Sequence, residues 1–143
     1  MNVKQNINRP KGYKKQRKME NLQAFKEKKS EDILRSMIDY LNFDNEDSDS
    51  DFDCGYTQEN IDECAAILDN YIDELEKCKQ NETLIMECVK DVILALNNLN
   101  EKCNYRIIET DQREYLCPFI EDAAVAAGFP QPKDDITGEW REW

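Results

Sequence analysis

The chain has 143 residues, of which 40% are hydrophobic and 35% are charged, and its formal net charge is −12. This length predicts one domain, and the acidic balance argues against nucleic-acid binding by the whole chain and favours a cationic partner. No stretch has the apolar length of a membrane span or the pattern of a signal peptide, so we expect a cytoplasmic protein without a membrane partner.

The residue types that most enzymes and metal sites use are scarce. The chain has no histidine and no serine after Ser50, which removes the usual general base and the commonest zinc ligand. Its six cysteines are ten to fifteen residues apart, and none forms a Cys-x-x-Cys pair. We therefore expect no catalytic residues, no metal and no cofactor, and we expect the cysteines to behave as small buried hydrophobic residues.

The charge is divided unevenly along the chain. Residues 1–29 carry ten Lys and Arg side chains against two Glu, a net charge of +8, whereas residues 30–143 carry −20. Two interpretations follow: the basic segment is an arm that binds nucleic acid, or it is a solvated tail, which can also lie against its own acidic body. Nucleic-acid binding is expected only through this segment.

Apolar residues three and four positions apart predict a first helix from Met19 to about Leu41, with a break at Ser30, which is the expected N-cap. The acidic stretch that follows does not fit a calcium-binding loop, because Phe52 or Cys54 stands where that loop requires glycine. The predicted organisation is a basic N-terminal extension (1–29), a helix (30–43), an acidic linker (44–53) and a helical core (54–143).

Two long helices are predicted at the start of the core. The first begins after Thr57 and runs to about Lys79, and the second begins after Asn81 or Thr83 and continues to about Cys103. In both, apolar residues recur in alternating steps of three and four, which is typical of helices packed side by side. The short link between them makes them antiparallel neighbours.

The last third of the chain predicts a third helix and a short final turn. Ile107–Ile108 is expected to be a strand-like connector, Thr110 to cap the helix, Pro118 to kink it and Gly128 to end it. Thr137 is expected to cap a last turn that carries both tryptophans on one side. The predicted fold is therefore all-α: a small antiparallel bundle of three or four helices with a short C-terminal helical turn.

The outward positions of the helix 57–79 are almost all acidic, which makes them the first candidate for a binding surface. Asp69 and Asp73 form a like-charge pair four residues apart, which costs roughly 0.2–0.5 kcal/mol, so reversing both to lysine is expected to leave the fold intact or firmer. A face kept acidic at such a cost favours a basic partner, although acidic helices also serve as soluble surfaces. The candidate partner-binding residues here are Asp62, Glu63, Asp69, Asp73 and Glu76.

The tryptophans at the end of the chain, Trp140 and Trp143, are the second candidate. Exposed tryptophan is typical of a partner-binding anchor, because it buries a large area at little cost in entropy. The alternative is a clasp, in which both indoles fold back over the bundle and complete its core.

The last third of the chain also resembles a group of known proteins. The residues 108–114, Ala123-Ala124, Gly128 and the segment Asp135-Ile136-Thr137-Gly138-Glu139-Trp140-Arg141-Glu142-Trp143 resemble the ending of small uncharacterised bacterial all-helical proteins, some of which are associated with toxin-immunity neighbourhoods. This resemblance implies a bacterial protein that works by binding. It assigns no role to any single residue.

Three functions are therefore considered. The first is a small acidic protein-binding module, of immunity or inhibitor type, that covers a basic site on a partner such as a toxin or a nucleic-acid enzyme. The second is a phage-type nucleic-acid mimic that blocks a DNA-binding enzyme with its carboxylates. The third is nucleic-acid binding through the basic N-terminal arm.

Overall fold

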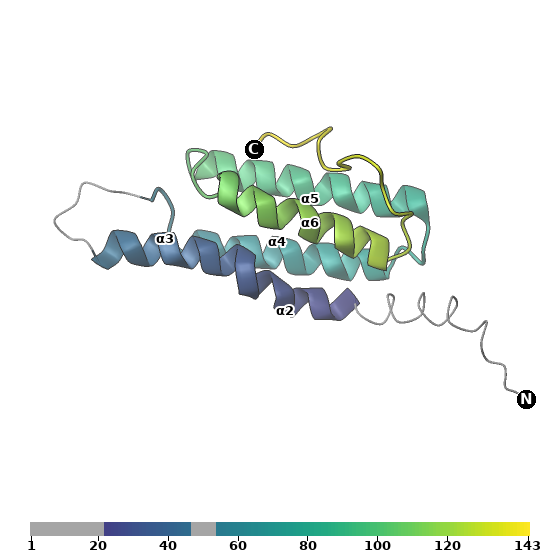
Figure 1. Ribbon diagram of the computed structural model, residues 1–143, viewed down its shortest axis with the longest axis horizontal. Coiled ribbons are helices and arrows are strands. Elements are labelled where there is room, and N and C mark those ends of the chain that lie inside the picture. Colours follow the sequence, from purple (N-terminus) through teal and green to yellow (C-terminus); the bar gives the residue numbers. More distant parts are fainter. Residues whose placement is uncertain (1–21, 47–53) are drawn as a thin grey trace, which may run out of the picture.

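The computed structural model describes residues 22–46 and 54–143, and within these ranges every regular element is helical (Figure 1). The prediction of an all-α bundle is therefore confirmed. The elements in chain order are η1 (Leu22–Ala24), α2 (Phe25–Lys29), η2 (Ser30–Leu34), α3 (Arg35–Glu46), α4 (Gln58–Glu76), α5 (Glu82–Lys102) and α6 (Thr110–Ala126).

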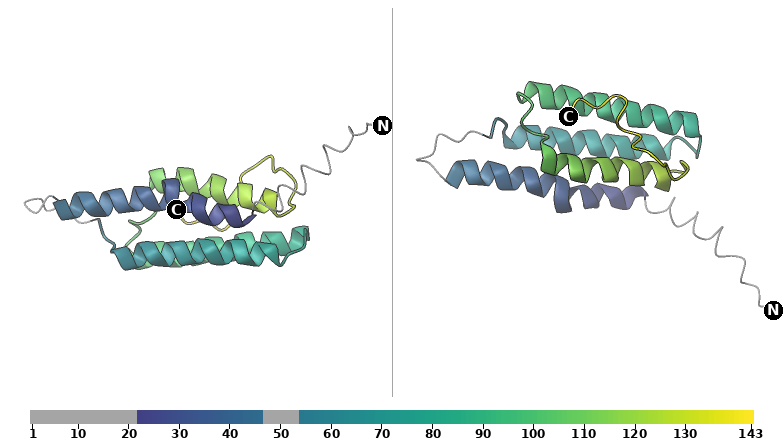
Figure 2. Two further views of the ribbon diagram at one scale, coloured as in Figure 1. Left: turned by 90° about the horizontal axis from the view of Figure 1, so that it is seen from below. Right: turned by 45° about the horizontal axis from the view of Figure 1, so that its top comes forward.

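The helices form two layers with alternating directions. The first four elements follow one another without a gap and act as one long first helix, which lies beside α6 in one layer, while α4 and α5 lie side by side in the other (Figure 2). The C-terminal segment then runs back along α5 (Figure 1). Each helix therefore buries one apolar face against the opposite layer.

The long first helix differs from the prediction in both its ends and its continuity. It begins by Leu22 and continues to Glu46, and Ser30 opens a single π-helical turn, Ser30–Leu34, instead of a cap. Leu22 is fully buried, and the Phe25 ring packs edge-on against the ring of Phe119 at 5.6 Å between centroids. Residues 22–29 thus belong to the bundle and not to an extension, because they carry part of its core.

The predicted boundaries of the basic extension and of the acidic linker both differ from those in the structure, because helix extends into each segment. Residues 44–46 of the predicted linker belong to α3. Residues 1–21 and 47–53, which make up the remainder of the two segments, lie outside the described residues.

The starts of α4 and α5 agree with the prediction. The backbone N–H of Thr57 donates to the side-chain oxygen of Asn60 at 2.9 Å, so α4 begins after Thr57. The side chain of Asn81 accepts from the backbone N–H of Leu84 at 3.1 Å, which caps α5. Both caps satisfy backbone groups that a helix end leaves without partners.

Helix α6 begins one residue earlier than predicted. Glu109, not Thr110, is the N-cap, because Glu109 has extended backbone angles and its N–H donates to the side chain of Gln112 at 3.0 Å. Pro118 lies inside α6, which nevertheless continues to Ala126.

The connections on either side of α6 are fixed by specific hydrogen bonds. Gly128 takes a φ of +120° and donates to the carbonyl of Val125 at 3.0 Å, which ends α6 as predicted. Ile107 and Ile108 are buried in the link that precedes α6, and the backbone N–H of Ile108 donates to the side chain of Asn100 at 3.0 Å. This link is irregular and not strand-like, since its hydrogen bond goes to a helix side chain.

All six cysteines are free thiols. Cys64, Cys78 and Cys103 are buried on the apolar sides of the bundle, which confirms their predicted role as small hydrophobic residues. Burial raises the pKa of the Cys64 thiol to about 12. Cys88 and Cys117 are half-buried and lie at the edge of the core.

One asparagine of α5 holds the C-terminal segment in place. The side-chain amide of Asn97 donates to the carbonyl of Trp140 at 2.8 Å, and its oxygen accepts from the backbone N–H of Glu142 at 3.1 Å. Asn97 thereby pairs with the main chain much as a neighbouring strand would. Both tryptophans are half-buried and pack against the core, as a clasp requires.

The same segment is braced by an internal network centred on Asp135. This carboxylate accepts from the backbone and the hydroxyl of Thr137 and forms an ion pair with Arg141 at 2.9 Å. Burial acts to raise the pKa of Asp135, but these hydrogen bonds outweigh it and hold the pKa below its usual value. Asp135 rather than Thr137 therefore organises the final turn, which spans residues 136–140 and leads into an irregular end.

Replacing Asn97 by alanine should release the C-terminal segment. Two hydrogen bonds from a buried side chain are lost, so we expect the free energy of unfolding to fall by about 1–3 kcal/mol in urea denaturation. Asn98→Ala is the matched control, because Asn98 is exposed on the same helix and brings the same change in helix propensity. Equal stabilities of the two variants would contradict the clasp.

Candidate functional site

The acidic residues of α4 that were predicted to bind a partner lie on two different sides of this helix. Asp69, Asp73 and Glu76 face the long first helix, and Asp62 shares their stripe because it precedes Asp69 by two helical turns. Glu63 instead faces α5. The predicted acidic residues therefore do not form one continuous surface, because Glu63 lies on a different side of α4 from the others.

On the first of these sides, the acids are paired with lysines from the same chain. Lys26 Nζ lies 2.6 Å from Asp73 Oδ1, and Lys29 Nζ lies 2.7 Å from Asp69 Oδ1. The ammonium group of Lys29 also donates to the carbonyl of Lys26, and the Lys29 side chain is only 10% exposed. Of the two interpretations of the basic segment, contact with its own acidic body is thus the one seen for these two lysines.

These pairs change the ionisation of the groups that form them. The hydrogen bond from Lys26 lowers the pKa of Asp73, and the same contact raises the pKa of Lys26. Glu76 adds to the field that keeps Lys26 charged. Asp62 is in no ion pair with a described residue, and its carboxylate accepts a hydrogen bond from Gln58 at 3.0 Å.

The pairing overturns the expectation that lysines at positions 69 and 73 would leave the fold intact or firmer. Lys26 and Lys29 sit against these carboxylates, so a reversal would place cations against cations, one of them largely buried. Asp69 and Asp73 therefore fasten the first helix, and their charges are already matched within the chain.

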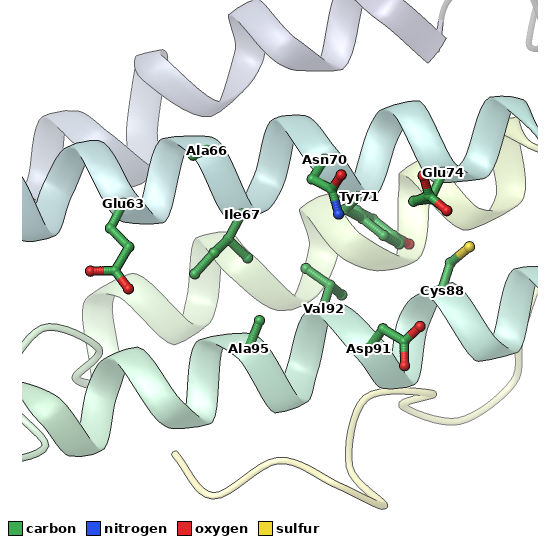
Figure 3. A pocket seen from close by; sticks show the side chains of 10 residues that line it. All are labelled: Glu63, Ala66, Ile67, Asn70, Tyr71, Glu74, Cys88, Asp91, Val92 and Ala95. Carbon is green, nitrogen blue, oxygen red and sulfur yellow. The ribbon is translucent and has the colours of Figure 1, made fainter.

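On its other side, α4 forms a groove with α5 (Figure 3). The groove has a volume of about 370 Å³, and side chains from the two helices point toward each other across it. Ala66 and Ala95 are too short to fill the space between the helices, which leaves it open. Its lining residues are Glu63, Ala66, Ile67, Asn70, Tyr71 and Glu74 of α4, and Cys88, Asp91, Val92 and Ala95 of α5.

The carboxylates at this groove differ in how they are paired. Both oxygens of Glu63 accept from Lys102, at 2.8 and 2.9 Å, and Glu74 pairs with Lys77 at 2.9 Å. Asp91 forms no ion pair with any residue in the described ranges. An unmatched negative charge therefore lies beside an apolar floor, a combination that suits a cation carried on an apolar stem.

A second acidic groove, of about 220 Å³, lies between the long first helix and α6. Lys28 places its ammonium 4.8 Å from the centre of the Phe25 ring, and Tyr115 stands partly exposed at the rim. The carboxylates that line this groove are Glu31, Asp32, Glu114 and Asp122. None of them is in an ion pair within the described part of the chain, so this groove provides a second acidic surface for comparison.

The two tryptophans are not part of either acidic groove. Trp140 lines a shallow hollow together with Met86 and Phe129. The Trp143 ring lies under the guanidinium of Arg141, 5.4 Å from its centre. Both indoles pack against the core and hold the C-terminal segment in place. Ala66 and Asp91 were not predicted as candidates, because nothing in the sequence shows that α4 and α5 leave a groove between them.

Comparisons with known proteins add no assignment. The chain matches no protein-family model, no curated protein and no solved structure. In residues 22–46 and 54–143, no cluster of three or more Cys, Asp or Glu is placed to hold a metal ion. No helix among those described has both the length and the apolar character needed to cross a bilayer.

Reversing Asp69 and Asp73 to lysine should destabilise the protein. The largely buried ammonium of Lys29 would lose its partner and face a like charge, so we expect a loss of about 1–3 kcal/mol in the free energy of unfolding. The matched control reverses Glu87 and Asp91, which are also four residues apart on a helix but are in no ion pair among the described residues. We expect the control to stay within about 0.5 kcal/mol of the wild type, measured by guanidinium denaturation. Equal losses in the two variants would refute the role given to the lysines.

Proposed function

We propose that the protein is a small acidic protein-binding module, of immunity or inhibitor type, whose groove between α4 and α5 receives a basic segment of a partner protein. The observation that carries this proposal is the carboxylate of Asp91, which lies beside the apolar floor of the groove and forms no ion pair within residues 22–46 and 54–143. Interfaces with complementary charge gain specificity and association rate, and an apolar floor adds contact area.

The shape of the groove indicates what kind of segment it would accept. Ala66 and Ala95 allow the backbone of a partner helix to approach closely, while Ile67 and Val92 supply apolar contact. Glu63 and Glu74 flank this floor in exposed ion pairs, which contribute little stability and can exchange partners. The fitting occupant is a helix with small apolar residues on one side and a Lys or Arg that reaches Asp91.

The pairing on α4 favours this proposal over the nucleic-acid mimic. A mimic needs many unmatched carboxylates in place of phosphates, but Asp69, Asp73 and Glu63 are matched by lysines of the chain itself. Two outcomes separate the classes. A mimic should compete with duplex DNA for a nucleic-acid enzyme, whereas an immunity protein should bind one cognate toxin encoded beside it.

The third function, nucleic-acid binding through the basic segment, loses part of its support. Of the ten basic residues in that segment, Lys26 and Lys29 are in ion pairs and Lys28 lies over the Phe25 ring. The other seven lie outside the described residues. Nucleic-acid binding would therefore depend on residues 1–21.

The groove is tested by titrating ¹⁵N-labelled protein with an alanine-rich helical peptide that carries lysine and arginine on one side. We expect amide shift changes at Ala66, Ile67, Asp91 and Ala95, and we expect them to weaken with added salt, because charge attraction is screened over about 8 Å at physiological ionic strength. The Glu87→Lys, Asp91→Lys variant should lose these changes.

The matched control carries Glu114→Lys and Asp122→Lys, which alter the net charge equally but at the second acidic groove. This variant should bind the peptide as the wild type does. Shift changes centred on the second groove, or binding lost equally in both variants, would show that the α4–α5 groove does not select the peptide.

A further inference from the structure

Two cysteines meet at one end of the α4–α5 groove. Cys78 follows the end of α4 and Cys88 lies in α5, and their sulfur atoms are 3.5 Å apart. Cys78 is buried, with its sulfur also 3.3 Å from the carbonyl oxygen of Glu74, whereas Cys88 is half-buried and lines the groove. The Cys88 thiol is thus accessible from the groove, and the buried Cys78 thiol lies in contact with it.

We propose that Cys78 and Cys88 form an oxidation site, at which hydrogen peroxide converts the two thiols into a disulfide that links α4 to α5. A disulfide requires sulfurs about 2 Å apart, so the two atoms need to approach by roughly 1.5 Å. Cys88 lies at one end of the open groove, beside Glu74 and Asp91 (Figure 3), so its side chain can rotate to bring the two sulfur atoms together.

The reaction balances without any group other than the peroxide. The thiolate of Cys88 attacks one peroxide oxygen, the oxygen–oxygen bond breaks, and Cys88 becomes a sulfenic acid as hydroxide leaves. The sulfur of Cys78 then attacks the Cys88 sulfur, which releases the oxygen as water and forms the disulfide. Two thiols lose two electrons, and the peroxide takes them to yield two water molecules.

The surroundings of Cys88 set the speed of the first step. Burial, the hydrogen bond with Cys78 and the carboxylates of Glu74 and Asp91 raise the pKa of Cys88 to about 12. At neutral pH the thiolate is therefore scarce, so the pair stays reduced unless peroxide persists. Below this pKa the rate should rise about tenfold per pH unit, and removing the Asp91 charge should speed the reaction.

Any effect of the disulfide on partner binding rests on the function proposed for the groove, but the oxidation itself does not. The disulfide would fix the spacing of α4 and α5 at one end of the groove and replace the free Cys88 thiol in its wall. Peptide mapping needs no partner, so failure of the groove proposal and failure of the oxidation site are seen in separate measurements.

The test treats the full-length protein with hydrogen peroxide, blocks the remaining thiols and identifies linked peptides by mass spectrometry. We expect a peptide pair joined through Cys78 and Cys88, a loss of two hydrogens from the intact mass, and a melting temperature raised by several degrees that dithiothreitol reverses. Asp91→Asn should form the link faster than the wild type at the same pH.

Two variants give the control. Cys88→Ala should abolish the link, whereas Cys117→Ala should keep it, because Cys117 is also half-buried with a raised pKa but contacts Thr137 instead of a thiol. A link through other cysteines, or oxidation of Cys88 that stops at sulfinic acid without a link, would overturn the proposal.

Discussion

The ion pair between Lys29 and Asp69 is the contact on which the rest of the arrangement depends. It joins the long first helix to α4, and it does so with a lysine whose side chain is almost fully enclosed. The same helix carries Leu22 and Phe25 into the core, so the apolar and the charged contacts favour one placement. Without that placement, the layer formed with α6 would leave the core open to water.

This contact also neutralises part of the acidic surface of α4. On one side of α4, Asp69 and Asp73 are paired with Lys29 and Lys26, whereas Asp91 in the groove toward α5 forms no ion pair with a described residue. Although the chain has a net charge of −12, some of its carboxylates are therefore neutralised by lysines of the same chain. The function proposed for the groove therefore rests on its short side chains and on the carboxylate of Asp91, not on the number of acidic residues in α4.

The features that local sequence determines were predictable, and those that depend on distant residues were not. Thr57, Asn81 and Gly128 act on their own helix ends, so their roles followed from neighbouring residues. The two bonds of Asn97 and the contact of Cys78 with Cys88 each require knowledge of a second segment. The acidic stripe of α4 was visible in the sequence, but its lysine partners lie forty or more residues away.

A double-mutant cycle on Lys29 and Asp69 tests this account most directly. Lys29→Met and Asp69→Asn are made singly and together, and the free energy of unfolding of each protein is measured by urea denaturation at low salt. A coupling energy of about 1 kcal/mol is predicted, reduced from the value for a fully buried pair because Asp69 is 42% exposed. Additive effects of the two substitutions, with no coupling, would contradict the claim that this ion pair stabilises the contact between the first helix and α4.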